Sequence, residues 1–366
     1  MPDDDSFDLA VVGAGIVGLA HAEAAAQRGL RVVVVERSTQ ITGSSVRNFG
    51  HVGVGMHVGG ARHYADLSRG IWMRLAEAAG FWLRESGSLM VARADDELAV
   101  LEESGVGELF TARQVADAAP VVGALGGMRS PLDLQVDPRE AAPALARHLA
   151  ERGVEFRWRT TALGAETGVL HTSRGPIRAQ AIVVAVNFDV DQLYPELAER
   201  YGVVRCALDM LLADGVGLGL PLLTGSTMLR YSAFASAPSA AAVRARFERE
   251  HPELLDLDIN QMYTERPDGT LVIGDTHVRD IAVSPFQSEA SFSVLERLTV
   301  DLFGRPISVR ERWQGVYASA PAEFLIEAPA DGVRVVAVTT GIGMTTGLGL
   351  GESVISDLFS STRGAP

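Results

Sequence analysis

Short apolar runs alternate with helix-favouring segments along this chain, and the first forty residues show the pattern most clearly. The runs from Phe7 to Val12 and from Arg31 to Val35 are apolar and rich in valine, which predicts two buried strands. Between them, Leu19 to Arg28 is rich in alanine and favours a helix, and Gly29 is suited to end that helix. A strand, a helix and a second strand in this order predict a parallel βαβ unit.

The same patterns recur towards the C-terminus. Asp137 and Pro138 have the form of a helix start, with Asp137 as N-cap and Pro138 at the first helical position. The dipeptide Asp268-Gly269 is expected to supply the turn of a β-hairpin. The other apolar runs predict strands at 154–158, 182–186 and 333–338, and helices at 138–149 and 348–359.

A glycine-rich turn joins the first strand to the first helix. Gly13 permits a tight turn, Gly15 lets the backbone approach a pyrophosphate, and Gly18 allows the helix to pack closely on the strand. Glu36 ends the second strand, where an acid accepts hydrogen bonds from ribose hydroxyls. The unit predicts a dinucleotide site, for either FAD or NAD, with contacts from Gly13, Gly15, Ile16, Val17, Gly18 and Glu36.

The composition fits a folded protein that does not bind nucleic acid. Of the 366 residues, 47% are hydrophobic and 21% charged, and this length predicts two interlocked domains. The net charge of −14 argues against a nucleic-acid surface. All 32 basic residues are arginine, which excludes chemistry that needs a lysine. The single cysteine, Cys206, and the lack of a signal sequence or membrane-length apolar run predict a cytoplasmic protein with no membrane contact.

A second polar motif, from Gly43 to His51, follows the second strand. Together with the glycine-rich turn, it makes the chain resemble the D-amino-acid oxidase and glycine oxidase family of FAD-dependent amine oxidoreductases. The resemblance extends over essentially the whole chain and includes Gly87 to Val91, which looks like the family's first substrate-domain strand. It implies that the second motif runs from the phosphates of FAD to its flavin ring, with contacts from Arg37, Ser44, Ser45, Arg47 and Asn48.

Two further stretches are assigned to FAD by this resemblance. Thr161-Ala162 is similar to the family's main-chain contact with adenine, and the segment 340–347 resembles a glycine-rich loop near the flavin pyrimidine. Where relatives attach the flavin through histidine, this chain has Arg47, and Cys206 lies far from the attaching cysteine, so FAD is expected to be non-covalent. The residues implied by these stretches are Ala162, Gly341, Gly343, Met344, Thr345 and Thr346.

The fold implied by the resemblance belongs to the α/β class. A Rossmann-like FAD-binding domain is expected to interleave with a smaller α+β substrate domain built on an antiparallel sheet. The FAD-binding domain is expected to comprise residues 1–85, 138–200 and 310–366, and the substrate domain residues 86–137 and 201–309.

The chain departs from the family at the arginine clamp for a substrate carboxylate. Tyr317 stands in place of one family arginine and Met344 in place of a second, which argues against a plain α-amino acid substrate. Three motifs, at 45–50, 274–277 and 313–317, look most like a subgroup associated with phosphonate metabolism. That resemblance implies an aminoalkylphosphonate or its N-methyl derivative as substrate.

A phosphonate dianion needs cationic and hydrogen-bonding partners. Two interpretations of Arg47 are open, a contact with this dianion or with the FAD pyrophosphate, and His277 either serves the site or only caps a turn. Arg230-Tyr231 is expected to end a strand, and the glycine-rich stretch 50–60 to be a mobile loop. The candidates are His277 and Tyr317 as catalytic residues and Arg47, His51, Tyr231 and Met344 as substrate-binding residues, with no metal ligand.

The predicted reaction is oxidation of a C–N bond, in which an anionic amine gives a hydride to flavin N5 and water hydrolyses the imine. Oxygen or another acceptor then takes the electrons; because lysine is absent, a protonated His277 or an arginine would have to supply positive charge for the reaction with oxygen. One alternative is a glycine- or sarcosine-type oxidase, and a second is a flavin-carrying electron-transfer subunit without amine chemistry of its own.

Overall fold

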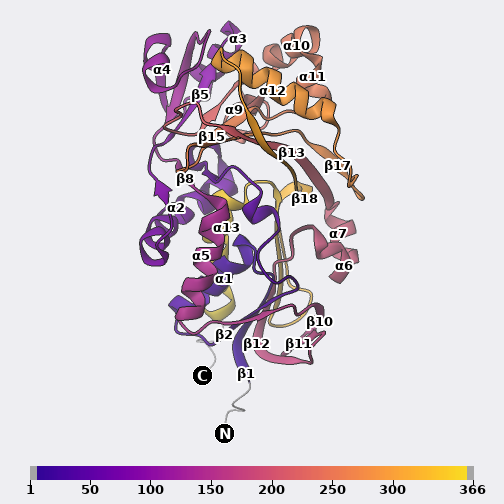
Figure 1. The fold of residues 1–366 in the computed structure, drawn as a ribbon. Coiled ribbons are helices and arrows are strands. Elements are labelled where there is room, and N and C mark those ends of the chain that lie inside the picture. The colour runs from indigo at the N-terminus through magenta and orange to yellow at the C-terminus, as the bar shows by residue number, and fades with distance from the viewer. Residues whose placement is uncertain (1–5, 361–366) are drawn as a thin grey trace.

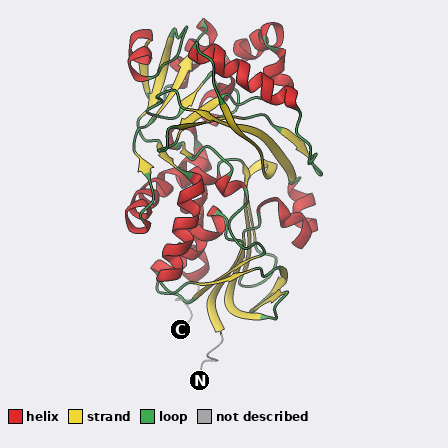
Figure 2. Ribbon diagram, viewed as in Figure 1, coloured by secondary structure: helices red, strands yellow, loops and turns green. Residues whose placement is uncertain are grey.

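The computed structural model describes residues 6–360, and one half of it, the nucleotide half, is a parallel sheet with packed helices (Figures 1 and 2). Its elements are the strands β1 (Ser6–Val12), β2 (Val32–Glu36), β9 (Glu155–Trp158), β12 (Ile177–Val184) and β19 (Val333–Thr340) and the helices α1 (Ile16–Gln27), α2 (Gly59–Ala79), α5 (Pro138–Glu151) and α13 (Gly343–Ser360). β1 pairs in parallel with β2 and β12. The segments Leu9–Val12 of β1 and Val32–Val35 of β2 are buried on both faces, as covered parallel strands require.

The second half, here the substrate half, is mainly antiparallel. Its strands are β5 (Ser88–Ala92), β6 (Glu108–Thr111), β7 (Gly126–Ser130), β13 (Val204–Asp214), β14 (Leu222–Leu223), β15 (Met262–Glu265), β16 (Thr270–Gly274) and β17 (Val278–Asp280). Its helices are α3 (Asp95–Ser104), α4 (Ala112–Ala118), α8 (Gly225–Met228), α9 (Ser232–Ala235), α10 (Ala240–Glu250), α11 (Pro252–Asp256) and α12 (Glu289–Phe303). β15 and β16 form the predicted hairpin, with Gly269 in the left-handed region at φ +75°, whereas β14 pairs with β5 in parallel.

A single long strand, β18 (Val309–Glu327), joins the two halves. Its first part pairs with β13 and its last part with β19, so that sixteen of the strands within residues 6–360 form one mixed sheet, while three short strands form a separate sheet. The α/β class predicted for the chain is therefore confirmed. β18 contributes to both halves, whereas the sequence assigns residues 310–366 to the FAD-binding domain alone, and the domain boundaries stay a prediction.

Smaller elements complete the described chain and correct one expectation. They are β3 (His51–Val52), β4 (Leu83–Arg84), β8 (Leu134–Val136), β10 (Ala162–Glu166), β11 (Val169–Thr172), η1 (Ser44–Val46), η2 (Val54–Met56), η3 (Asn187–Asp189), α6 (Val190–Leu193) and α7 (Pro195–Tyr201). The strands β3, β8 and β4 form the separate three-stranded sheet. The stretch 50–60, expected to be a mobile loop, contains β3 and η2 and begins α2. Its apolar side chains Val52, Val54 and Met56 are fully buried, which explains why it is ordered.

Two predicted element boundaries also change. Arg230 and Tyr231 do not end a strand; they lie in the helical turn between α8 and α9. The last helix begins at Gly343 and not near Leu348, because the glycine-rich segment already adopts the helical conformation. By contrast, α5 begins as predicted, with the Asp137 carboxylate accepting a hydrogen bond from the Arg139 N–H at 2.9 Å.

The last helix, α13, packs against both α1 and α2, and its glycines permit the close approach. A Cβ on Gly349 would lie 2.2 Å from the Tyr64 carbonyl oxygen of α2, and one on Gly351 would lie 2.8 Å from Ala20 of α1. The Trp72 indole N–H of α2 also donates to the Met344 carbonyl oxygen at 2.8 Å. These contacts fix the start of α13 relative to the parallel sheet.

No helix within residues 6–360 is long and apolar enough to cross a membrane. The same residues contain no cluster of three or more histidine, cysteine, aspartate or glutamate side chains that could hold a metal ion.

We predict that Gly349→Ala destabilises the protein, because the added methyl group collides with main-chain atoms of α2. Overpacking of this kind costs about 1–3 kcal/mol, which thermal unfolding would register as a fall of several degrees in Tm. The control is Gly70→Ala in α2, where a Cβ meets no atom within 4 Å. That variant should unfold at or above the wild-type temperature. An unchanged Tm for Gly349→Ala would contradict the proposed packing.

Candidate active site

A cavity of about 470 Å³ lies at the carboxyl ends of the parallel strands and continues into the substrate half. Open α/β sheets bind their ligands at this edge. The nucleotide half contributes the glycine turn after β1, the end of β2 and the start of β10. The substrate half contributes residues from β13, from the turn between α8 and α9, and from the segment after β16. Both predicted site regions therefore open into one cavity.

The glycine turn has the geometry that a dinucleotide requires. Gly13 has φ +102°, and a Cβ there would lie 2.5 Å from the Ala185 carbonyl oxygen. A Cβ on Gly18 would lie 1.9 Å from the Gly13 carbonyl oxygen, so only glycine lets α1 pack this closely on the turn. Gly13 and Gly15 line the cavity, whereas Gly18 acts in packing.

The acid at the end of β2 is held beside this turn. The Glu36 carboxylate accepts hydrogen bonds from the Ala14 N–H at 3.0 Å and from the Ser38 N–H at 2.8 Å, and it lines the cavity. Arg37 lines the cavity too, but its guanidinium forms an ion pair with Asp189 at 2.5 Å. Glu36 is therefore positioned by main-chain donors on both sides, as its predicted role in ribose binding needs.

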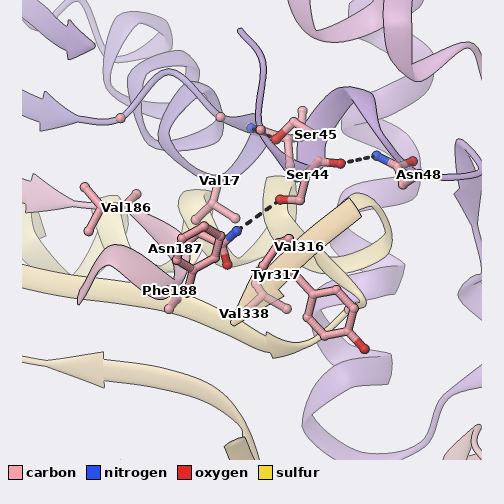
Figure 3. A pocket seen from close by; sticks show the side chains of 18 of the residues that line it. Val17, Ser44, Ser45, Asn48, Val186, Asn187, Phe188, Val316, Tyr317 and Val338 are labelled. Atoms are coloured by element: carbon pink, nitrogen blue, oxygen red, sulfur yellow. Dashed lines mark hydrogen bonds between the residues drawn. The ribbon is translucent and has the colours of Figure 1, made fainter. Parts of the chain in front are cut away.

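The second motif packs across the start of α1 (Figure 3). Ser45 Oγ accepts a hydrogen bond from the Ile16 N–H at 2.8 Å, and Asn48 Nδ2 donates to the Ser44 carbonyl oxygen at 2.8 Å. Arg47 is exposed at the rim of the cavity, and its guanidinium donates to the Gln314 carbonyl oxygen at 3.1 Å. The motif thus holds η1 against the glycine turn, with Ile16 and Val17 beside it on the cavity wall.

Asn187 begins η3, shortly after the strand β12, and it links the second motif to β18. Its φ of +58° lies in the left-handed region, which asparagine tolerates better than most residues. Its side chain donates to Ser44 Oγ at 3.1 Å and accepts from the Ala318 N–H of β18 at 2.7 Å (Figure 3). One residue therefore ties the second motif to the strand that carries Tyr317.

The predicted C-terminal contacts divide into two groups. Gly341, Gly343 and Met344 line the cavity. Thr345 and Thr346 do not line it, because their hydroxyls bond inside the protein: Thr345 Oγ1 accepts from the Gly53 N–H at 3.0 Å, and Thr346 Oγ1 donates to the Ile342 carbonyl oxygen at 2.9 Å. Ala162 lines the opposite end of the cavity, as the resemblance implies.

In the substrate half, the structure brings Tyr231, His277 and Tyr317 to the cavity but not His51. His51 Nε2 lies 3.1 Å from Asp133 Oδ2, and both side chains are buried. Asp133 also accepts hydrogen bonds from the hydroxyls of Ser88, at 2.6 Å, and Ser130, at 2.9 Å. The prediction that His51 contacts the substrate is therefore not supported, because its imidazole is committed to this internal network.

The cavity wall also includes residues that the sequence analysis did not select as contacts. Arg230 lies on the wall with its guanidinium 2.7 Å from Asp258 Oδ1, and its side chain is 20% exposed. Asp275, Asn260 and His57 line the same end of the cavity. Two features of the sequence pointed towards these residues: Arg230 precedes the candidate Tyr231, and Asp275 belongs to the motif 274–277. Neither could be placed without the tertiary structure.

The comparisons with known proteins agree with this geometry. A family model described as FAD dependent oxidoreductase (DAO) matches residues 8–357. The chain belongs to this family. A curated relative, the D-amino acid dehydrogenase of Helicobacter pylori, is 23% identical over 243 residues, which cover 49% of this chain and 59% of that protein. The chain therefore matches less than two thirds of the length of this relative.

Solved structures show the same fold over nearly the whole chain. The glycine oxidase of Bacillus cereus ATCC 14579 superposes with a TM-score of 0.79 at 17% identity, covering 97% of this chain and 95% of that one. The L-proline dehydrogenase of P. horikoshii gives a TM-score of 0.80 at 17% identity, covering 98% and 94%. At such identities the similarity establishes the fold alone.

The residues of this DAO-family chain fit FAD. The glycine turn leaves no room for a Cβ at Gly13, and Glu36 is held where the resemblance expects the ribose. At the other end, Gly341 has φ +79°, and a Cβ there would lie 3.0 Å from the Tyr317 ring. Glycines at both ends therefore keep side chains out of the cavity that the cofactor would occupy.

Burial sets the charge of the two histidines on the cavity wall. Desolvation lowers the pKa of His57 to about 4, and it lowers the pKa of His277 well below its usual value, with Arg230 adding to the second effect. Both imidazoles are therefore neutral at pH 7. His277 Nδ1 lies 2.8 Å from the Asp258 carbonyl oxygen; a carbonyl only accepts, so Nδ1 carries the proton and Nε2 presents a lone pair. The expectation of a protonated His277 is therefore not supported, which leaves arginine as the cation of this DAO-family cavity.

Asp275 and Tyr317 respond to the same low-polarity surroundings. Burial raises the pKa of Asp275 to about 7, against the lowering effect of Arg230. It raises the pKa of Tyr317 well above its usual value, so this phenol stays protonated and can donate a hydrogen bond. The substrate end of the cavity in this FAD-dependent oxidoreductase thus combines the Arg230 guanidinium, one carboxyl group that titrates near neutrality, and neutral hydrogen-bonding groups.

We predict that the stability of Asp275→Asn relative to wild type is greater at pH 8 than at pH 5. A carboxyl group whose pKa is raised on folding contributes stability at low pH and loses it as the pH rises through the folded pKa. Because each pKa unit corresponds to about 1.4 kcal/mol, the difference in unfolding free energy between variant and wild type should grow by about 3 kcal/mol between these pH values. Urea denaturation at both values measures it.

The matched control is Asp258→Asn. Although burial raises the pKa of Asp258, Arg230 and Arg279 lower it below its usual value. The effect of Asp258→Asn on the unfolding free energy should therefore change much less between pH 5 and pH 8 than the effect of Asp275→Asn, with a small residual change because Asp258 also raises the pKa of Asp275. A pH-independent effect of Asp275→Asn would contradict the assignment of a raised pKa to this carboxyl group.

Proposed function

We propose that this protein oxidises the C–N bond of an anionic amine with FAD as the hydride acceptor. The observation that carries the proposal is the single cavity that joins the dinucleotide turn to a wall bearing Arg230 and Asp275. A cation and a carboxyl group on one wall suit a substrate that has both an anionic group and an amine. The family relationship and the fold shared with glycine oxidase support the same chemistry.

The substrate anion is assigned to Arg230. This guanidinium lies on the cavity wall and is mostly buried, so its attraction to an anion is screened less by water than that of exposed Arg47. Tyr317, which stays protonated, is a second donor for the anion. Neutral His277 is not, because its single N–H already donates to the Asp258 carbonyl oxygen. Of the two interpretations of Arg47, we therefore favour a contact of this rim residue with FAD rather than with the substrate anion.

We further propose that the anion is a phosphonate, in an aminoalkylphosphonate or its N-methyl derivative. Support comes from the replacement of both clamp arginines, by Tyr317 and Met344, each of which lines the cavity. A tetrahedral phosphonate accepts hydrogen bonds in several directions, so one arginine and a phenol serve it better than they serve a planar carboxylate. The alternative of a glycine- or sarcosine-type oxidase is favoured by the fold shared with glycine oxidase.

In the proposed reaction, bound FAD supplies the acceptor for the hydride that leaves the carbon next to nitrogen. The side chains of this protein hold the substrate: Arg230 binds the anion, and Tyr317 donates to it. The main-chain N–H groups after β19, at the start of α13, favour negative charge on a group that lies beside them. We propose non-covalent binding of FAD, because Cys206 is fully buried and does not line the cavity.

Anaerobic mixing of the flavin-loaded protein with a panel of amines tests this function. We expect 2-aminoethylphosphonate or its N-methyl derivative to bleach the flavin absorbance and to yield an aldehyde. Bleaching by glycine or sarcosine alone would support the alternative oxidase. If no amine in a broad panel bleaches the flavin, the chain is better explained as a flavin-carrying electron-transfer subunit. Reoxidation by oxygen or by an artificial acceptor then separates an oxidase from a dehydrogenase.

We predict that Arg230→Gln weakens binding of the anionic substrate by about 10- to 100-fold, the loss of one charge-assisted hydrogen bond. Steady-state kinetics should show this mainly as a higher KM. The control is Arg279→Gln: Arg279 pairs with Asp258 at 2.5 Å, as Arg230 does, but it does not line the cavity. A smaller effect of Arg230→Gln than of Arg279→Gln would rule out Arg230 as the anion site.

A further inference from the structure

Four buried polar atoms on the cavity wall have no hydrogen-bond partner among the described residues. They are His57 Nε2, Asn260 Oδ1, Asp275 Oδ1 and Thr340 Oγ1. Buried polar groups in folded proteins are almost always paired, so unpaired atoms on the wall of a cavity are places where a ligand or water in that cavity can complete the bonding. Asn260 Oδ1 and Asp275 Oδ1 belong to two residues that are paired through their main chains, and these residues are 6% and 4% exposed.

The main chain fixes Asn260 and Asp275 as a pair. The Asn260 N–H donates to the Asp275 carbonyl oxygen at 2.9 Å, and the Asp275 N–H donates to the Asn260 carbonyl oxygen at 2.7 Å. The Asn260 side chain also hydrogen-bonds to the Asp275 carboxyl group. Each side chain thus uses one polar group in the bond to the other, while its remaining oxygen, Oδ1, has no hydrogen-bond donor within residues 6–360. Two adjacent oxygens without donors are suited to a ligand that carries several N–H groups.

We propose that Asp275, aided by Asn260, binds the ammonium group of the substrate and takes a proton from it. This inference rests on the function proposed above and assigns a catalytic role within it. The ammonium group transfers one proton to the Asp275 carboxylate, giving a neutral amine and a carboxylic acid. The nitrogen lone pair released in this step can form the C=N bond when hydride leaves the adjacent carbon for the flavin. Without this proton transfer, an ammonium nitrogen has no lone pair to give.

The surroundings of Asp275 suit this exchange. His277 Nε2 lies 3.6 Å from Asp275 Oδ2, beyond hydrogen-bond distance, and the pKa of His277 is well below its usual value, so the proton that the carboxyl group accepts stays on Asp275. Arg230 favours the carboxylate, while burial favours the acid, and the two effects leave the pKa of Asp275 near 7. The group can therefore hold or release a proton at neutral pH. The titratable and charged groups around it are Cys206, Arg230, Tyr231, Asp258, His277 and Tyr317.

The test compares two ligands that differ only in the amine, using the flavin-loaded protein without oxygen. If 2-aminoethylphosphonate is the substrate, the pair is this compound and ethylphosphonate; if glycine is, the pair is glycine and acetate. Dissociation constants come from the change in flavin absorbance or, for a ligand that reacts, from calorimetry with protein whose bound flavin has been reduced beforehand. We expect wild type to prefer the amine ligand and Asp275→Asn to lose at least 10-fold of that preference, with unchanged affinity for the amine-free ligand.

The pH dependence supplies an independent readout. In wild type, kcat/KM should rise as the pH passes through about 7, because the carboxylate is the form that accepts the proton. In Asp275→Asn this step should disappear, and the rate should follow the higher pKa of the free amine. A second variant, Asn260→Ala, removes one acceptor oxygen and should reduce the amine preference several-fold. It should also move the pH step upward, because the Asn260 side chain lowers the pKa of Asp275.

Asp209→Asn is the matched control. Asp209 on β13 is also buried, burial also raises its pKa, and its carboxyl group bonds to Thr276 and Ser291, but it does not line the cavity. This variant should keep both the amine preference and the pH step. An Asp275→Asn enzyme that keeps both would overturn the inference. Failure of the proposed function itself is a different result, because wild type would then not be bleached by any amine.

Discussion

The position of the site depends on the continuous pairing of β18 with β13 and then with β19. Ser319 is the point of exchange, since it lies opposite Val204 on β13 and opposite Thr340 on β19. Tyr317 lies two residues before this point, opposite Cys206, while Gly341 directly follows β19. Because one strand is hydrogen-bonded to both halves, the substrate wall cannot shift along the sheet without breaking the register on one side.

Contacts on both sides of β18 also hold the segment around Tyr317. Asn187 adopts the left-handed backbone conformation and connects Ser44 to Ala318 of β18. Tyr317 stands where the resemblance expects an arginine, and its ring lies over Gly341, the residue whose missing Cβ leaves space for it. These contacts position Tyr317 on the cavity wall.

The electrostatic character of the wall follows from burial. A guanidinium stays charged when buried, whereas an imidazole loses its proton, so Arg230 remains cationic while His57 and His277 become neutral. A buried carboxyl group instead retains its proton to higher pH, as Asp275 does. The acidic net charge of the chain is consistent with this arrangement, because the proposed anion binding relies on one buried arginine and on main-chain donors and not on surface charge.

Local sequence signals were sufficient to predict several strands and helices and the glycine turn. The βαβ unit, the cap at Asp137 and the hairpin at Asp268-Gly269 were predictable because their signals lie within a few consecutive residues. The tertiary structure decided which polar side chains reach the cavity. It placed His51 against Asp133 and directed Arg230 and Asp275 to one wall, although residues 230 and 275 lie in separate segments. Burial and hydrogen-bond pairing arise from contacts between distant segments. They determine the protonation state of each candidate side chain and whether it lines the cavity.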